Sequence, residues 1–390
     1  MRIIIVLIVI VKIYAQPLDL SQDWNTNADF IFSNELEEVI STNISVLPNI
    51  LGLIIIHNNE IVSENYYNGS NEDDIYNIWS VTKSYVSTLI GQAYDIEFIS
   101  SPNVSISNFF PNSNINQLEM ITLHNLLTMS SGYTDNYWYP NWFAQTPDNL
   151  LSMPYINPGI FYYNNSACHL NSHILYNISG LTPIEFANIH LFPYLGIENP
   201  IWYSGYSGIN DGSASLNLNL RDMVKLGQLF NQNGVSGNTQ VISSDWVSTA
   251  TTRHLETGYN EIPGYGYLWW IPEMEGTYLA YGYGGQFIAV IPDYDLVIGS
   301  HSTDYGPVDV NYHAINLLGI IYSELIPMFQ KADINNDDLV NILDIVKLIN
   351  FILGIDSPTN LQFFSSDINS DEIINIMDII QLVQISLNNS

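Results

Sequence analysis

Segments with the character of β-strands lie far apart in this chain, on either side of a long stretch with a helical pattern. Leu51–His57 and Glu60–Tyr67 flank Asn58 and Asn59, which tolerate the left-handed backbone of a hairpin turn. Later strands are expected at Tyr265–Trp270, Thr277–Tyr281, Gln286–Ile291 and Leu296–Ser300, and helices at Phe32–Ile44 and Val310–Leu325. The pattern predicts an α+β fold, in which one antiparallel sheet is built from distant parts of the chain and flanked by helices, with a helical lobe beside it.

Ser80 and Lys83 begin an apolar helical run that continues to about Gly91. At this spacing the two side chains share one face of a helix, so the lysine amine can touch the serine hydroxyl. A lysine can take the proton of a serine nucleophile when burial brings the lysine pKa to about 7–8. Ser-x-x-Lys is a common pattern that a solvated helix end would also explain. The apolar neighbours favour a buried lysine, which needs a compensating partner.

The N-terminus and the composition indicate an exported globular protein. Residues 1–15 have the positive start, short apolar core and final small residue of a signal peptide, and no later stretch predicts a transmembrane anchor. We therefore expect a secreted protein, extracellular or periplasmic. The formal net charge of -31 excludes nonspecific nucleic-acid binding, which needs a basic surface. The single cysteine, Cys168, can form no intramolecular disulfide and is expected to be a small buried residue.

Six blocks in the right order resemble the class C β-lactamase-related serine hydrolases. They are Ser80–Ser84, Ile121–Gly132, Pro158–Asn165, Leu220–Gly227, Tyr265–Trp270 and Gly282–Gln286. The last block is most similar to the esterase and oligoamide-hydrolase branch. The resemblance implies a β-lactamase/penicillin-binding-protein-like fold over residues 24–328 and catalysis through an acyl-enzyme, with no cofactor.

The resemblance also assigns catalytic roles. Ser80 would be the nucleophile. Tyr163 and Asn165 match the Tyr-x-Asn motif, in which the phenol shares proton transfer with Lys83 and the amide orients the substrate or the lysine. Without the flanking blocks, Tyr163 would be one of 26 tyrosines and would carry no such inference.

The same resemblance places four residues on the strand that lines the site: Tyr283, Gly284, Gly285 and Gln286. The N–H groups of Gln286 and Ser80 would form the oxyanion hole. Tyr283 occupies the position of a lysine or histidine, which in β-lactamases pairs with the substrate carboxylate. A phenol supplies no charge, and no Lys or Arg lies between Arg253 and Lys331. We therefore expect neutral esters or small amides as substrates. β-Lactamase or D-alanyl-D-alanine carboxypeptidase activity is the alternative, and it would need another arginine, such as Arg221 or Arg253, at the site.

Other functional classes have less support. No Gly-x-Ser-x-Gly sequence indicates a Ser-His-Asp triad, and His124 is expected to be a structural helix histidine. A zinc hydrolase is disfavoured, on the expectation that the chain offers neither a His-x-x-x-His pair nor a cysteine cluster to a metal. A non-catalytic binding protein or scaffold-associated protein with the same fold is the alternative from another class. The joint presence of Ser80, Lys83, Tyr163 and Asn165 argues against it.

The C-terminal segment contains a duplicated acidic pattern. Asp333, Asn335, Asp337, Asn341 and Asp344 recur with the same spacing as Asp367, Asn369, Asp371, Asn375 and Asp378. These are the oxygen ligands of an EF-hand-type calcium loop, with the backbone carbonyls of Leu339 and Ile373 at the seventh position. With apolar helices expected at Ile345–Leu353 and Ile379–Leu387, the segment 331–390 resembles a dockerin, a small all-α calcium-binding module that docks extracellular enzymes onto scaffold proteins.

Two departures from the dockerin pattern affect calcium and the partner. The sixth loop position, usually glycine, is Asp338 in one loop and Glu372 in the other, which costs about 1 kcal/mol of backbone strain each. The positions after Asn341 and Asn375 are apolar where many dockerins carry hydroxyl residues. A cohesin-like protein, another surface protein, or the rest of this chain are therefore all retained as candidate partners.

Overall fold

The computed structural model describes residues 17–27, 30, 33–134, 145–335, 339–369 and 371–388. The expected signal peptide at 1–15 lies outside these residues, as do residues 336–338 of the first predicted calcium loop, which include Asp337 and Asp338. No helix in the described ranges is long and apolar enough to cross a membrane.

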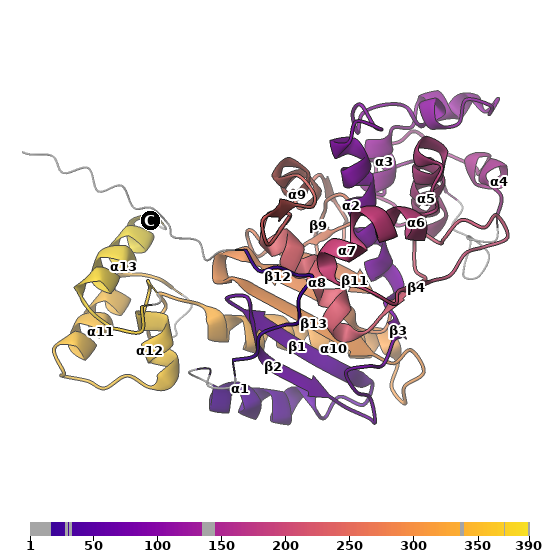
Figure 1. Cartoon of the computed structure of the whole chain (residues 1–390). Coiled ribbons are helices and arrows are strands. Elements are labelled where there is room, and N and C mark those ends of the chain that lie inside the picture. The colour runs from indigo at the N-terminus through magenta and orange to yellow at the C-terminus, as the bar shows by residue number, and fades with distance from the viewer. Residues whose placement is uncertain are drawn as a thin grey trace, which may run out of the picture.

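One eight-stranded antiparallel sheet forms the centre of the larger module, in the order β2-β1-β13-β12-β11-β10-β9-β8. Its strands are β1 (Ile50–His57), β2 (Glu60–Tyr66), β8 (Leu255–Glu256), β9 (Gly264–Tyr265), β10 (Trp270–Ile271), β11 (Tyr278–Gly282), β12 (Gln286–Ile291) and β13 (Leu296–Ser302). The N-terminal β1 pairs with β13, with Ile55 opposite Ile298, and Figure 1 shows these indigo and orange strands side by side. The prediction of one sheet built from distant parts of the chain is confirmed.

Alternating side chains of β1 enter two separate cores. Ile54 and Ile56 face the helices α2 (Thr82–Asp95) and α8 (Leu220–Asn231). Leu53 and Ile55 face the other layer, which contains α1 (Ser33–Val39) and α10 (Val310–Ile320). The period of two in a strand therefore explains why all eight β1 residues are buried. The hairpin to β2 turns at the expected Asn58 and Asn59, whose φ angles are 51° and 69°.

The helical lobe lies beyond the α2 side of the sheet (Figure 1). Its helices are α3 (Leu123–Leu127), α4 (Pro147–Leu151), α5 (Asn165–Ser179), α6 (Pro183–His190) and α7 (Phe192–Leu195), and α9 (Ser244–Ala250) lies between it and the sheet edge. Short strands accompany them: β3 (Tyr76–Asn77) with β4 (Ile201–Trp202) and β5 (Leu216–Leu218), and β6 (Val235–Ser236) with β7 (Thr239–Gln240).

Three predicted elements differ in detail. The expected strand Tyr265–Trp270 is a turn between β9 and β10, closed by a hydrogen bond from the N–H of Gly266 to the carbonyl of Trp269. Leu268 has a φ of 61° there, which an extended strand does not allow. The expected helix Val310–Leu325 is α-helical to Ile320 and then widens to a π-helical turn at Ile321–Leu325. The first helix likewise ends in a π-helical turn, at Ile40–Ile44.

The C-terminal module is helical, with α11 (Ile342–Ile352), α12 (Asn360–Ser366) and α13 (Ile376–Asn388). It has its own small core, in which Leu348 of α11 and Leu382 of α13 are fully buried. The two helices that follow the calcium loops are confirmed, each beginning slightly before its predicted start. The sequence reasoning missed α12.

Helix α12 joins the two modules through Phe364, which is 7% exposed. Its ring packs edge-on against His57 of β1 at 5.6 Å and against Phe30 at 6.2 Å. The ammonium of Lys331 lies 4.7 Å from the centre of the Phe364 ring and donates a hydrogen bond to the carbonyl of Asp367. Burial, with the nearby charge of Lys331, lowers the pKa of His57 to about 3, so the imidazole at this joint is neutral.

Truncation of Phe364 should loosen this joint. We expect Phe364→Ala to lower the free energy of unfolding by about 3 kcal/mol, because truncation leaves a cavity where the ring packs. Phe98→Ala is the matched control, since Phe98 is 47% exposed and should contribute less than about 0.5 kcal/mol. Urea denaturation followed by tryptophan fluorescence measures both variants. Equal losses for the two would show that Phe364 does not hold the modules together.

Candidate active site

Ser80 lies in a tight turn that the structure holds in an unusual backbone conformation. It is the middle residue of a 3-10 turn at Trp79–Val81, directly before α2. Trp79 has a φ of 48°, which is rare for a bulky residue and costs about 1–2 kcal/mol. The N–H of Trp79 donates to the side chain of Asn77 at 2.9 Å, which helps to fix the turn. A strained turn at a serine that begins a helix is a common feature of functional sites.

Lys83 is buried, with 1% of its surface exposed, and its Nζ has three oxygen partners. These are Ser80 Oγ at 2.9 Å, Asn165 Oδ1 at 2.8 Å and the carbonyl of Ser213 at 2.7 Å. An amide oxygen and a backbone carbonyl can only accept hydrogen bonds. A neutral amine that donates its two hydrogens to them directs its lone pair at Ser80 Oγ. The geometry therefore fits a base for the serine hydroxyl.

Tyr163 and Asn165 come from the segment that enters α5. Asn164 caps this helix by accepting the N–H of Ala167 at 2.8 Å, which places Asn165 in its first turn. The Tyr163 ring lies 4.8 Å from Lys83 Nζ and stacks on Trp270 at 5.6 Å with an interplanar angle of 19°. The structure thus brings Ser80, Lys83, Tyr163 and Asn165 together, from two segments that are far apart in the chain.

A further residue of this site, Ser213, was missed by the sequence reasoning. Its carbonyl accepts from Lys83, and its own N–H and hydroxyl both donate to Asp211, at 2.8 and 2.7 Å. A backbone acceptor leaves no side-chain pattern in a sequence. The available signal was local: an aspartate two residues before a serine is typical of a turn held by the aspartate side chain.

Three of the four residues expected on the strand beside the site lie in a turn instead. Tyr283, Gly284 and Gly285 form the turn between β11 and β12, where the two glycines have φ angles of 83° and 102°. The expectation that this segment is strand is therefore wrong. Gly282, at the end of β11, is the glycine that faces the Ser80 turn, because a Cβ there would lie 2.5 Å from the carbonyl of Ile78.

Gln286 is the first residue of β12, and its side chain is bound to β13. It donates to the carbonyl of Ser302 at 2.5 Å and accepts the N–H of Ser302 at 3.3 Å. The side chain is therefore structural, and the oxyanion role of the Gln286 N–H stays a prediction. Tyr283 does lie beside the nucleophile: its ring packs edge-on against Trp79 at 5.3 Å and is 45% exposed.

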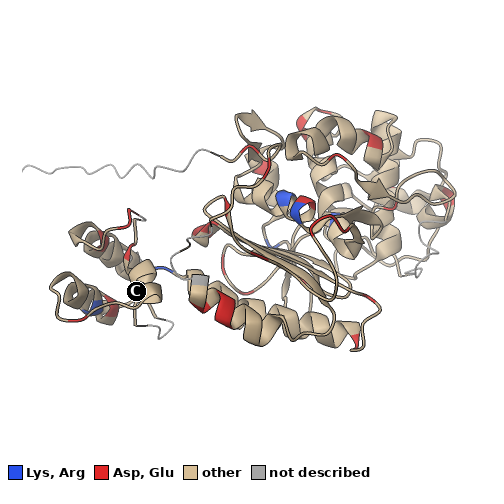
Figure 2. Ribbon diagram, turned by 60° about the horizontal axis from the view of Figure 1, so that its bottom comes forward, with Lys and Arg blue, Asp and Glu red and all other residues tan. Residues whose placement is uncertain are grey.

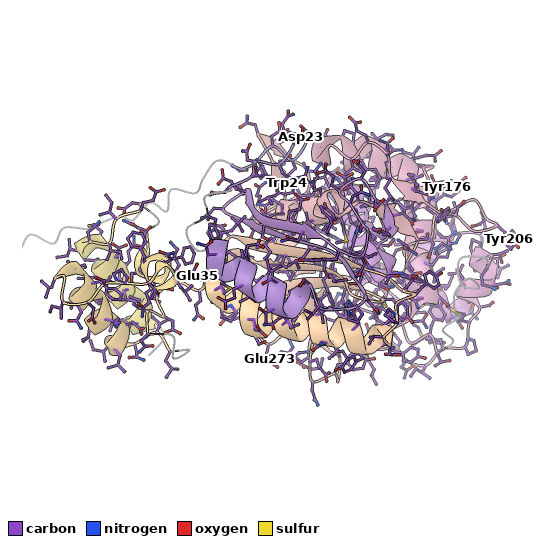
Figure 3. The ribbon with its side chains drawn as sticks, turned by 90° about the horizontal axis from the view of Figure 1, so that it is seen from below. Asp23, Trp24, Glu35, Tyr176, Tyr206 and Glu273 are labelled. Atoms are coloured by element: carbon purple, nitrogen blue, oxygen red, sulfur yellow. The ribbon has the colours of Figure 1, made fainter. Side chains whose placement is uncertain are left out.

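The cations of the larger module other than Lys83 are committed to carboxylates. Arg221 forms a two-point pair with Glu64, at 2.7 and 2.6 Å, and Lys225 pairs with Asp222 at 3.1 Å. Arg253 pairs with Glu256 and with Glu273, the latter labelled in Figure 3. Figure 2 shows that the ribbon has few blue segments (Lys and Arg) and many red ones (Asp and Glu). The arginines that a carboxylate-binding site would need are therefore held elsewhere.

A carboxylate, that of Asp304, lies beside the Ser80 turn. Asp304 forms a side-chain hydrogen bond with Trp79, and burial raises the pKa of Asp304. When it is ionised, a carboxylate hydrogen-bonded to the residue before the nucleophile repels anionic substrates.

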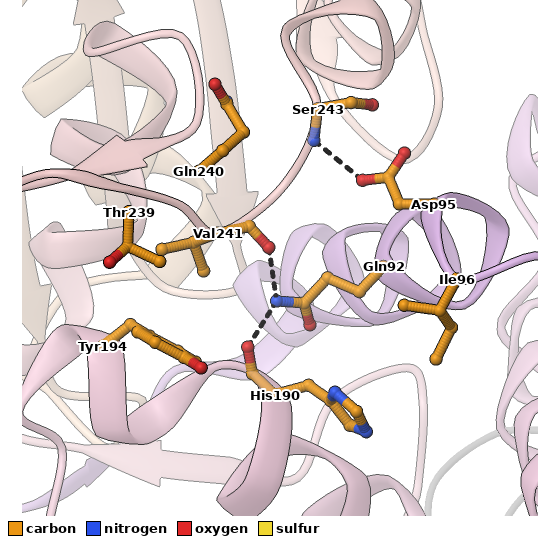
Figure 4. A pocket seen from close by; sticks show the side chains of 9 residues that line it. All are labelled: Gln92, Asp95, Ile96, His190, Tyr194, Thr239, Gln240, Val241 and Ser243. Atoms are coloured by element: carbon orange, nitrogen blue, oxygen red, sulfur yellow. Dashed lines mark hydrogen bonds between the residues drawn. The ribbon is translucent and has the colours of Figure 1, made fainter.

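A pocket of about 410 Å³ lies away from Ser80, at the other end of α2 (Figure 4). There Gln92 donates to the carbonyls of His190 and Val241, and Asp95 accepts the N–H of Ser243 at 2.7 Å. These bonds tie α2 to the end of α6 and to the segment before α9. We read this pocket as a structural junction, because it contains no nucleophile and base in contact.

The buried histidines and the cysteine near α5 are structural. His169 and His173 have the His-x-x-x-His spacing, which escaped the sequence argument against zinc, and their rings meet at 4.8 Å. Burial lowers the pKa of His169 to about 3. No group of three His, Cys, Asp or Glu in the described part of the chain could hold a metal ion.

Cys168 is buried as expected, and burial raises the pKa of its thiol to about 12, so it is unreactive. His124 contacts Tyr267 at 2.9 Å, as a structural histidine would.

The two loops predicted to bind calcium close in the same way. Asp344 accepts the N–H groups of Ile334, Asn335 and Asn341, and Asp378 accepts those of the equivalent residues in the second loop. Asp344 and Asp378 are fully buried, and Asp333 and Asp367 are 6% exposed. Four buried carboxylates in so small a module are costly without cations, so this donor set fits calcium.

Other predicted ligands are used locally in the structure. Asn341 and Asn375 accept an N–H two residues on, at 2.8 Å, and donate to the carbonyls of Leu339 and Ile373 at 3.1 Å. Asn369 donates to Asp371 at 2.9 Å. Within the described part of each loop, three carboxylates do not converge on one point. Asp337 lies outside the described residues, and the calcium set stays a prediction.

Glu372 shows the backbone strain expected at the sixth loop position, with a φ of 64°. Glycine adopts this conformation without the cost that other residues incur. We expect Glu372→Gly to raise the calcium affinity of the second loop about fivefold, as measured by isothermal titration. Glu372→Gln is the control, because it removes the charge and keeps the strain. If the glutamine variant gains as much as the glycine variant, charge and not strain limits binding.

Comparisons with known proteins agree with this architecture. Residues 49–320 match the family model described as Beta-lactamase, and residues 331–385 match the model described as Dockerin type I domain. An uncharacterized protein of Alkalihalophilus pseudofirmus is 22% identical, over 74% of this chain and 95% of its own length. The predicted resemblance, β-lactamase-related with a C-terminal dockerin, is confirmed.

Solved structures show the same fold at low identity. A Bacillus anthracis protein assigned as a 6-aminohexanoate-dimer hydrolase has a TM-score of 0.64 at 20% identity, covering 80% of this chain and 90% of that one. A class C β-lactamase from Rhodobacter sphaeroides has a TM-score of 0.56 at 16% identity, covering 75% and 99%. The hydrolase EstCE1, described as having promiscuous acyltransferase activity, has a TM-score of 0.57 at 13% identity, covering 70% and 94%.

Proposed function

The chain belongs to the β-lactamase family, and from that premise we propose that it is a secreted serine hydrolase of neutral carboxylic esters or small amides, acting through an acyl-enzyme at Ser80. The observation that carries the proposal is the three-way contact of Lys83 Nζ with Ser80 Oγ, Asn165 Oδ1 and the Ser213 carbonyl. This contact leaves the amine lone pair for the serine proton.

The reaction then has two steps. Ser80 Oγ attacks the substrate carbonyl carbon while its proton passes to Lys83 and Tyr163, and the bond to the leaving group breaks as that group takes up the proton. Water then attacks the acyl-enzyme, releases the acid and returns a proton to Ser80. Asn165 holds Lys83 in place, and the N–H groups of Ser80 and Gln286 stabilise the oxyanion.

The charge around Ser80 supports a neutral substrate. Tyr283 and Asp304 both contact Trp79, the residue before the nucleophile, whereas Arg221 and Arg253 are paired with glutamates. A β-lactam or a D-alanyl-D-alanine peptide would bring a carboxylate to this surface without a charge-assisted partner. The β-lactamase alternative therefore lacks the arginine that it needs.

A comparison of two substrates tests this proposal. We expect kcat/KM for a neutral short-chain ester to exceed that for a chromogenic cephalosporin, and Tyr283→Lys to raise cephalosporin turnover about tenfold by supplying a charged partner. Tyr305→Lys, at a position 92% exposed, is the control for the added charge and should leave both values unchanged. A wild-type preference for the cephalosporin would contradict the argument from the missing cation.

A second function concerns the C-terminal module. We propose that residues 331–390 bind calcium through the two duplicated loops and dock a cohesin-like or other surface protein, while residues 24–328 form the hydrolase module. The match of residues 331–385 to the dockerin model supports this, and so do the paired loop closures at Asp344 and Asp378. Export through the signal at residues 1–15 would bring both modules to the cell exterior.

The main alternative is a binding protein that keeps the fold without catalysis. The close packing of Ser80, Lys83 and Asn165 argues against it. Burial of an amine against a serine hydroxyl costs free energy of folding, and a protein that only binds its ligand has no use for this arrangement. Hydrolysis of no ester or amide by the purified protein would favour this alternative.

A further inference from the structure

Partly exposed aromatic rings from separate segments gather beside Tyr163. Trp270 of β10 stacks on Tyr163 and contacts Phe161, from the segment before α5, at 6.0 Å. Tyr259, from the loop between β8 and β9, lies 6.1 Å from Trp270 and 6.3 Å from Phe161. Tyr281 of β11 lies 6.3 Å from Trp270. These five residues form what we call the aromatic cluster.

The aromatic cluster lies at the margin of the core, against which most of its rings pack while they remain partly exposed. Its neighbour in sequence, Trp269, is fully buried and packs against Phe230 at 4.7 Å and Tyr278 at 5.3 Å. Trp270 packs on the buried Tyr265 at 4.8 Å but is itself only partly buried, while Tyr259 is 51% exposed. Trp269 is therefore a core residue, whereas the aromatic cluster keeps part of its ring surface, above all that of Tyr259, accessible to a ligand.

The position of the cluster relates it to one part of the substrate. In the proposed function, which this inference rests on, Tyr163 passes a proton to the leaving group, so a group bound beside Tyr163 is on the leaving side. Aromatic side chains bind a neutral aromatic ring more strongly than an aliphatic group of the same size. We propose that the aromatic cluster is a subsite for a neutral aromatic leaving group, such as that of an arylmethyl ester.

The chemistry remains that of the hydrolase. Ser80 Oγ bonds to the ester carbonyl carbon, the bond from that carbon to the arylmethoxy oxygen breaks, and the serine proton leaves on the released alcohol. Water then cleaves the acyl–Ser80 bond, which yields the acid and restores the hydroxyl. No oxidant, reductant or second substrate is needed.

Two acetate esters with equal acyl groups test the subsite. Benzyl acetate and cyclohexylmethyl acetate differ in the ring alone, and their kcat/KM values are compared after correction for their rates of alkaline hydrolysis. For the wild type we expect a preference of about three- to tenfold for the benzyl ester. Tyr259→Ala should bring the ratio near one, without loss of the fold, because Tyr259 is half exposed.

Tyr176→Ala is the matched control. Tyr176 is 42% exposed and lies three turns along α5 from Asn165, about 16 Å away, and Figure 3 labels it. This variant should keep the wild-type ratio. A second measurement needs no variant: benzyl alcohol should inhibit turnover of a common ester more strongly than cyclohexylmethanol does.

The outcomes separate this inference from the proposed function. Equal turnover of both esters by the wild type, or an unchanged ratio in Tyr259→Ala, would overturn the subsite while leaving the hydrolase intact. Turnover of neither ester, together with a failure of a fluorophosphonate to label Ser80, would overturn the proposed function and the subsite with it.

Discussion

Replacement of Ser80 by alanine should lower kcat by about 10⁶-fold, the loss typical of a missing covalent nucleophile. Lys83→Met should lower kcat by about 10³-fold or more, because the amine that contacts Ser80 Oγ at 2.9 Å is removed while the apolar volume is kept. Since the two residues act as a unit, the double variant should be no slower than Ser80→Ala alone.

The measurement is single-turnover kinetics on a neutral ester, with thermal unfolding to show that each variant is folded. Ser84→Ala is a control on the same helix, because Ser84 is also buried but donates its hydroxyl to the carbonyl of Leu268. Losses that multiply in the double variant would mean that Ser80 and Lys83 act in separate steps, which contradicts the base assigned to Lys83.

Removal of calcium should unfold the C-terminal module and leave the hydrolase module folded. The module has a core of only a few buried apolar side chains, and its buried carboxylates repel one another until cations neutralise them. Hydrogen exchange of the full chain, followed by mass spectrometry, should show α11 and α13 losing protection in excess chelator while β12 and β13 keep theirs.

Variants at the last loop position provide the control for chelation. Asp344→Asn and Asp378→Asn each keep the size of the side chain that closes the loop but remove its negative charge. Each variant should therefore raise the calcium concentration needed to protect the helices from hydrogen exchange by about tenfold or more. Equal protection of α11 and α13 with calcium and with chelator would show that this module folds without the metal.

Local patterns in the sequence were sufficient for much of the fold. Asn58 and Asn59 identified the first hairpin, because few residues accept the left-handed backbone that they adopt. The duplicated acidic pattern identified the dockerin module and the helices that follow its two loops, since each loop closes through bonds between residues that are near one another in the chain. The spacing of Ser80 and Lys83 likewise lies within one helical turn.

Features that depend on long-range packing were not predicted. The run Gly282–Gln286 contains three glycines, and only the pairing of β11 with β12 shows that Gly282 faces Ile78 while Gly284 and Gly285 make the turn. The acceptor role of Ser213 is carried by a backbone carbonyl, which every residue has. The docking of Phe364 depends on surfaces that meet only after both modules fold.

The central claim is that Ser80 forms a covalent acyl-enzyme with Lys83 as its base, and intact-mass spectrometry after fluorophosphonate treatment tests it most directly. We expect one adduct per wild-type chain, none on Ser80→Ala, a much slower adduct on Lys83→Met, and wild-type labelling of Ser248→Ala, a control at an exposed serine of α9. Equal adducts on the wild type and Ser80→Ala would contradict it.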